Sequence, residues 1–226
     1  MHLTVLAIGV AFAALGVVAE RTASVWPPDE ASGRGPGLRT VALAFAAAAV
    51  GAGVAWRSQL PVWATAVYLL MLVALVFLTA TDLEQRRLPH LLLDPLILAA
   101  ALFVPFNPAV PPVSALLGAA AAVGFLGVLA LVVRGGLALG DLYLVAPIGL
   151  FLGWPAIFVA IFVAALLAAL ASLGLMLMRR VGMKSYIPFG PFLVAGAVVA
   201  LLTQPDLLVP RSAESAIVLS SLIPWR

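Results

Sequence analysis

Long apolar runs separated by short polar stretches make up most of this chain. A hydrocarbon core about 30 Å thick is crossed by a helix of about 20 apolar residues, and eight runs reach or approach that length. They cover residues 3–19, 39–56, 61–81, 90–104, 112–133, 141–153, 155–178 and 188–203. The pattern predicts an all-α fold, a polytopic membrane bundle of about eight transmembrane helices.

Polar segments between the runs suggest how the chain is organised. We expect an N-terminal helix pair at 1–60, a six-helix core at 61–203 and a tail at 204–226. Within the pair, the Pro- and Gly-rich segment 20–38 is expected to be a flexible connector, too short for a folded domain. The apolar run in the tail is too short to span comfortably, so we expect it at the membrane interface.

Proline marks several predicted helix boundaries. Pro61, Pro89 and Pro155 stand at the starts of runs, where the missing amide hydrogen of a first-turn proline is harmless. The stretch "FNPAVPP" at 106–112 predicts a turn.

Composition supports a membrane protein and excludes several classes of function. Hydrophobic residues make up 65% of the chain and charged residues 9%, against roughly 25% charged in soluble domains. Twelve basic against nine acidic residues are a weak basis for binding nucleic acid, and we expect none. The chain has no cysteine and two histidines, which excludes disulfides, thiolate zinc sites and Cys nucleophiles. We expect no metal and no cofactor.

The basic residues predict the orientation. With the N-terminus outside, the loops after the odd-numbered runs are cytoplasmic, and they hold nine of the twelve Lys and Arg residues. The first run lacks Lys or Arg before it, whereas Arg21 follows it. This charge order favours a retained helix over a cleaved signal peptide.

Nine acidic residues remain to be explained. Asp82 ends the third run and Asp141 opens the sixth, so both are predicted at the cytoplasmic face, where they could meet. Asp94 lies four residues after His90, which predicts a structural pair on one helix face. The other six are expected on the solvated surface: Glu20, Asp29, Glu30, Glu84, Asp206 and Glu214.

Asp141 borders an unusually short run. Thirteen residues make a helix of about 20 Å, so its start can lie below the headgroups if Gly135, Gly136 and Gly140 provide irregular backbone there. The helix dipole would then favour the anion. The alternative is a plain N-cap facing water.

At these two acids the sequence resembles the type IV prepilin peptidase family of membrane aspartic proteases. "DLEQRRLPH" is similar to its Asp-then-Pro motif, from Asp82 to Pro89. "LALGDLYL" is similar to its Gly-x-Gly-Asp motif, with Gly140 before Asp141. "YIPFGPFLVAGA" resembles its Ile-Pro-Phe-Gly-Pro segment, and these three motifs occur in the family's order.

The resemblance implies an aspartic endopeptidase that cleaves the leader peptides of prepilins or pseudopilins at the cytoplasmic face of the bacterial inner (plasma) membrane. It implies Asp82 and Asp141 as the catalytic pair. Substrate-binding or structural roles are implied for five motif residues: Pro89, Gly140, Pro188, Gly190 and Pro191. Two carboxylates held close together share a proton, so one can activate water while the other stabilises the oxyanion.

The chain departs from the family's pattern in several places. Ala138 replaces the first motif glycine, Tyr143 occupies a place often held by lysine, and His90 one often held by a polar amide. Larger members carry a Cys-x-x-Cys insertion associated with N-methylation, for which segment 20–38 offers only a connector. We therefore expect peptidase without N-methyltransferase activity.

Two other classes of function fit paired membrane carboxylates less well. A proton- or cation-coupled transporter usually places its coupling acids near the midplane and shows repeat symmetry, and the sequence shows no repeat. A non-enzymatic subunit of a secretion machine would not require two acids at matched depth.

Overall fold

The computed structural model describes residues 2–26, 32–132, 138–178 and 188–212. These residues form eight α-helices and one 3₁₀ turn, which confirms the predicted all-α bundle. The elements are α1 (His2–Val25), α2 (Leu38–Arg57), α3 (Val62–Gln85), α4 (His90–Phe103), η2 (Val104–Phe106), α5 (Pro112–Val132), α6 (Leu139–Leu152), α7 (Ala156–Leu177) and α8 (Gly190–Thr203). The apolar run of the tail lies outside the described residues.

Helix lengths divide the bundle into two groups. The helices α1, α2, α3, α5 and α7 are long and apolar enough to cross a membrane, whereas α4 with η2, α6 and α8 are shorter apolar helices. Two of the shorter helices lie at the centre, since α8 packs on α3, α6 and α7, and α6 packs on α4, α5 and α8. The third, α4, packs on α3 and α6 and exposes large apolar side chains such as Leu98 on its other side.

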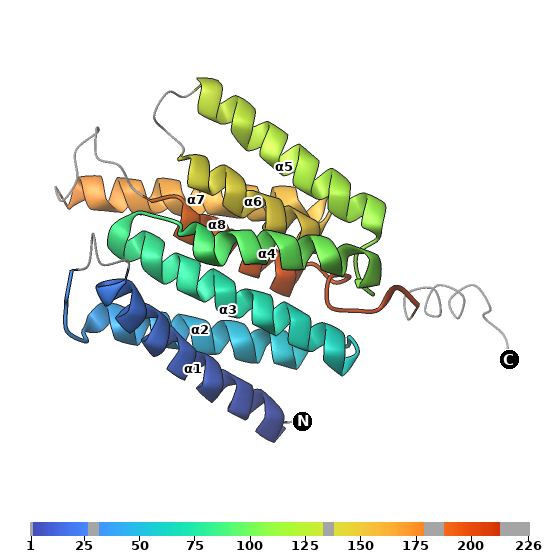
Figure 1. Ribbon diagram of the computed structural model, residues 1–226, viewed down its shortest axis with the longest axis horizontal. Helices are drawn as coiled ribbons and strands as arrows, with labels where there is room; N and C mark the ends of the chain where they lie inside the picture. The colour runs from blue at the N-terminus through green and yellow to red at the C-terminus, as the bar shows by residue number, and fades with distance from the viewer. Residues whose placement is uncertain (1, 27–31, 133–137, 179–187, 213–226) are drawn as a thin grey trace, which may run out of the picture.

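The helices run in alternating directions. In Figure 1, the C-terminal ends of α1, α3, α5 and α7 lie at the left of the bundle, together with the N-terminal ends of the helices that follow them. Asp82 is in the last turn of α3 and Asp141 is in the first turn of α6. Both acids therefore lie at this end of the bundle, which we call the Asp82 end.

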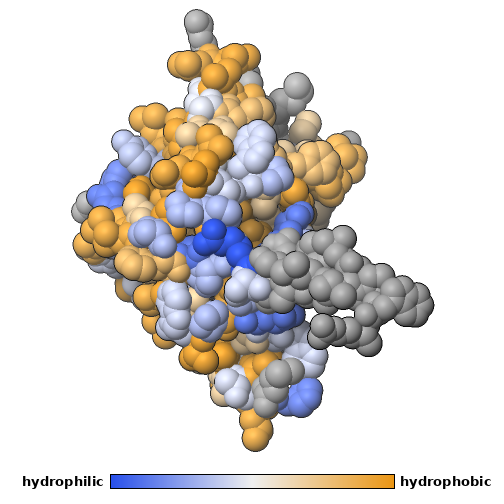
Figure 2. Space-filling model, turned by 90° about the vertical axis from the view of Figure 1, so that its right-hand side faces the viewer, coloured by the Kyte–Doolittle hydropathy of each residue, from blue (hydrophilic) through white to orange (hydrophobic). Residues whose placement is uncertain are grey.

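The surface of the bundle suits lipid. Large apolar side chains are exposed along the helices, for example Leu3, Phe45, Leu70, Leu98 and Phe162. An apolar surface of this extent marks contact with a membrane rather than with water. Figure 2 shows the opposite end of the bundle, where hydrophilic residues gather near the centre and hydrophobic residues surround them.

Glycines bring neighbouring helices close together, as is usual in membrane bundles. A Cβ on Gly196 of α8 would lie 2.1 Å from the carbonyl oxygen of Ala160 on α7. A Cβ on Gly149 of α6 would lie 2.6 Å from the Cα of Ala119 on α5. The backbones are in direct contact at both crossings, with no room for a side chain.

Several helix starts follow the predicted proline signals, whereas other boundaries differ from the predicted runs. Pro61, Pro89 and Pro155 each immediately precede a helix. By contrast, α1 continues six residues beyond its predicted end, to Val25. The extension includes Glu20, which is buried, so the prediction of a solvated Glu20 is wrong.

Candidate active site

Asp82 lies at the end of α3 with little access to solvent. Its side chain is buried, and its Oδ2 atom has no hydrogen-bond partner among the described residues. The helix stops one turn later, where Arg86 adopts a left-handed conformation and donates its backbone amide to the carbonyl oxygen of Asp82 at 2.9 Å. The backbone amide of Gly190 interacts with this carboxylate, yet the Oδ2 atom itself remains without a partner in the described part of the chain, which is costly in a purely structural role.

Asp141 lies in the first turn of α6. The helix begins two residues earlier than predicted, at Leu139, and Ala138 is the capping residue. The Asp141 side chain accepts a hydrogen bond from the backbone amide of Ala138 at 3.1 Å and is buried. The alternative of an N-cap facing water is therefore wrong, although the acid does occupy the helix end that favours a negative charge.

Three helices bring the two acids into one site. Asp82 and Asp141 are close enough to interact electrostatically. Gly190, the first residue of α8, packs against Asp82 so closely that a Cβ there would lie 2.5 Å from Oδ2, and 3.6 Å from the side chain of Leu144 on α6. The site thus lies where α3, α6 and α8 converge at the Asp82 end.

The remaining motif residues surround this convergence. Pro89 caps the start of α4, and a Cβ on Gly140 would lie 3.1 Å from the side chain of Leu88, just before it. Pro188 is half-buried before α8, and Pro191 lies in the first turn of that helix. Gly135 and Gly136 lie outside the described residues.

Two of the residues that differ from the family motif contact each other. The rings of His90 on α4 and Tyr143 on α6 meet edge to face, with centroids 5.4 Å apart. His90 also pairs with Asp94 at 3.0 Å, as the four-residue spacing predicts. Because Asp94 is exposed and engaged with His90, it takes no part in the pair of buried acids.

Sequence reasoning missed an ionic cluster next to the site. Arg34 contacts both Glu20 and Glu84, and the side chains of these two acids are only 7% exposed, so the prediction that they are solvated is wrong. Opposite charge explains their burial. No local spacing signals this cluster, because its members come from α1, the connector and α3.

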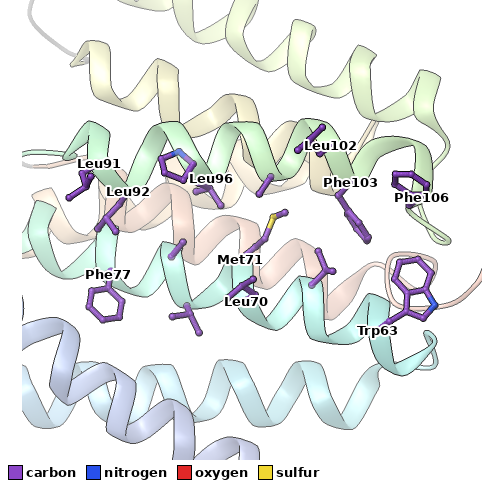
Figure 3. Close-up of a pocket in the computed structure, with 15 residues that line it drawn as sticks. Trp63, Leu70, Met71, Phe77, Leu91, Leu92, Leu96, Leu102, Phe103 and Phe106 are labelled. Atoms are coloured by element: carbon purple, nitrogen blue, oxygen red, sulfur yellow. The ribbon is translucent and has the colours of Figure 1, made fainter.

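An apolar groove of about 1050 Å³ lies between α3 and α4. Figure 3 shows side chains from both helices along it, from Trp63 at one end to Phe77 and Leu91 at the other. All fifteen lining residues are apolar. The groove therefore offers no group for acid–base chemistry.

Comparison with known proteins identifies the same region. Residues 69–173, which include both acids, match the model of the Type IV leader peptidase family. A prepilin leader peptidase/N-methyltransferase of Aeromonas salmonicida (strain A449) is 35% identical over 149 residues, covering 63% of this chain and 50% of that protein. One of Bacillus subtilis (strain 168) is 32% identical over 154 residues, covering 67% and 60%. One of Burkholderia pseudomallei (strain 1026b) is 33% identical over 133 residues, covering 57% and 43%.

The chain spans about half the length of the curated relatives it matches. No solved structure matches it. The matched relatives are leader peptidases, which favours this class over a transporter. Three ordered motifs, two buried acids at one end of a polytopic bundle and these matches make the core at residues 69–173 similar to the type IV leader peptidase family.

Proposed function

We propose that this protein is an aspartic endopeptidase that removes leader peptides from prepilin-like proteins, with Asp82 and Asp141 as its catalytic pair. The observation that carries the proposal is the convergence of two buried carboxylates, one with an unpartnered oxygen, at one end of the bundle. The charge distribution supports the cytoplasmic face of the bacterial inner membrane as the place of cleavage.

The geometry supports water activation by the pair. Two nearby carboxylates cannot both carry a charge at low cost, so they hold one proton between them. The ionised group takes a proton from water, and the oxygen of that water attacks the scissile carbonyl carbon. The protonated group donates a hydrogen bond to the carbonyl oxygen and stabilises the developing negative charge. Transfer of a proton to the leaving amine then breaks the peptide bond.

Neighbouring residues restrict the position of each acid. The amide of Ala138 and the start of α6 hold Asp141 in place through one of its oxygens. Gly190 leaves no room for the Asp82 carboxylate to move toward α8. The two groups act as one titrating unit, so neither is singled out as acid or base.

We also propose that the chain cleaves without methylating its product. The relatives' names include an N-methyltransferase activity, but the family resemblance associates that activity with paired cysteines, and the sequence contains none.

The test is prepilin cleavage by purified protein in detergent. Asp82→Asn and Asp141→Asn are each expected to abolish turnover, and the double variant to be no worse, because the pair acts as a unit. An Asn at 141 still offers an oxygen to the Ala138 amide, so a mere capping role predicts little loss. Asp94→Asn is the matched control, since its carboxylate is exposed on α4. EDTA is expected to leave the wild type active. Substantial cleavage by a well-folded Asp141→Asn protein would overturn the assignment.

A further inference from the structure

An ionic cluster, whose two acids are buried and whose Arg34 is partly exposed, joins α1 to the end of α3 that carries Asp82. A single nitrogen, Nη2 of Arg34, contacts Glu20 Oε1 at 2.8 Å and Glu84 Oε2 at 2.9 Å. Glu20 also accepts a hydrogen bond from Thr40 of α2 at 2.9 Å, and Glu84 accepts one from Ser32. The cluster therefore ties α1, the connector, α2 and α3 together at one point.

A second bond lies beside it. The side-chain amide of Gln85 donates to the backbone carbonyl of Ala23 on α1 at 2.8 Å, in buried surroundings. Gln85 is the last residue of α3, and Glu84 precedes it. Both attachments to α1 thus lie within three residues of Asp82, on the last turn of its helix.

Charge makes Arg34 the central member of the cluster. The hydrogen bond to Glu20 raises the pKa of Arg34 above its already high value, so the guanidinium stays charged. Without it, two carboxylates that now share one nitrogen would lose the cation that joins them and would repel each other. Arg39 contacts Glu84 only at 3.4 Å and is largely exposed, and Arg21 is 4.0 Å from Glu20. Neither bridges the two acids.

We propose that the Glu20–Arg34–Glu84 cluster positions Asp82 for catalysis, which makes Arg34 a positioning residue and α1 a working part of the active site. The proposal rests on the proposed peptidase function. It extends the site beyond residues 69–173, the part of the chain that matches the family. Loss of the bridge removes one of the two polar attachments between α1 and the end of α3, and loosens the turn that carries Asp82.

The kinetic test compares three variants. Arg34→Gln is expected to lower kcat at least 10-fold with KM changed less than about twofold, because the substrate still binds while the pair of acids is misaligned. Arg34→Lys keeps the charge and is expected to recover most of the rate. Arg39→Gln, the matched control, removes a cation from the same cluster without removing a bridge, and is expected to behave like the wild type. If Arg34→Gln does not fold, the triple variant Glu20→Gln, Arg34→Met, Glu84→Gln removes the unpaired charges as well and is expected to show the same loss of kcat.

A distance measurement tests the cluster without relying on activity. The chain contains no cysteine, so Val18→Cys on α1 and Leu83→Cys on α3, both exposed, accept a pair of spin labels. We expect a narrow distance distribution in the otherwise wild-type protein and a broad one with Arg34→Gln. An unchanged distribution, or a wild-type kcat in Arg34→Gln, would overturn the positioning role. Failure of the wild type itself to cleave would instead overturn the proposed function, while the distances would still report on the cluster.

Discussion

Gly190 offers the sharpest test of how tightly the site is built. An alanine there would place its Cβ 2.5 Å from Oδ2 of Asp82, whereas ordinary contacts of carbon lie near 3.5 Å. The carboxylate must therefore move by about 1 Å. A displacement of about 1 Å at a catalytic group can cost about 100-fold in rate, equal to about 2.7 kcal/mol at 1.36 kcal/mol for each factor of ten.

Stability and activity are expected to separate in this variant. Gly190 is the first residue of α8, and alanine there reduces the entropy of the unfolded chain by about 0.4–1 kcal/mol, which partly offsets the crowding. We therefore expect Gly190→Ala to fold with a nearly unchanged apparent Tm and to lose about 100-fold in kcat for prepilin cleavage. Gly174→Ala on α7 is the control, because its Cβ would meet no atom within 4 Å. A folded Gly190→Ala protein with wild-type kcat would refute the claim that Gly190 holds Asp82 in place.

Three further predictions concern packing, orientation and product. Gly196→Ala is expected to lower the apparent Tm in detergent by overpacking worth about 1–3 kcal/mol, because its Cβ would lie 2.1 Å from the backbone of Ala160; a melting curve that overlays that of Gly174→Ala would contradict it. A cysteine at Gly35 is expected to be labelled only from the cytoplasm and one at Gln59 only from outside, and the reverse pattern would invert the orientation. Mass spectrometry of the processed pilin is expected to show a free amino terminus with or without S-adenosylmethionine. A methylated terminus would disprove the proposal that the protein lacks N-methyltransferase activity.

Helices were the most predictable feature of this chain. The apolar runs of a membrane protein coincide with its helices, because every backbone polar group in lipid must be paired within the helix. The run at 39–56, for example, became the helix Leu38–Arg57. The main error was the end of α1, where Glu20 and Ser24 continue the helix. Polar residues signalled a loop, but Glu20 is paired with Arg34 and Ser24 donates to the carbonyl of Arg21 at 2.8 Å.

The site was predictable in outline but not in detail. Counting charges placed Asp82 and Asp141 at one face, because basic residues report which helix ends share a side of the membrane. The same count does not reveal that Gly190 packs on Asp82, or that His90 meets Tyr143. Those contacts depend on how α8 and α4 pack against their neighbours, and the apolar runs of these helices carry no information about rotation.

The cluster around Arg34 shows a limit of reading charges one at a time. In a membrane protein, a basic residue in a short loop already has a sufficient explanation as a topological signal, and an acid beside it as a solvated group. Arg34 and Glu20 are 14 residues apart, and Glu84 belongs to another helix, so neither explanation reveals that they meet. A basic residue in such a loop can also form an ion pair within the protein. It can serve as a topological signal and as an ion-pair partner together, because both roles place it at the same membrane face. In the proposed function, the residues predicted to orient the chain in the membrane therefore include Arg34, which would hold the helix that carries Asp82 in place.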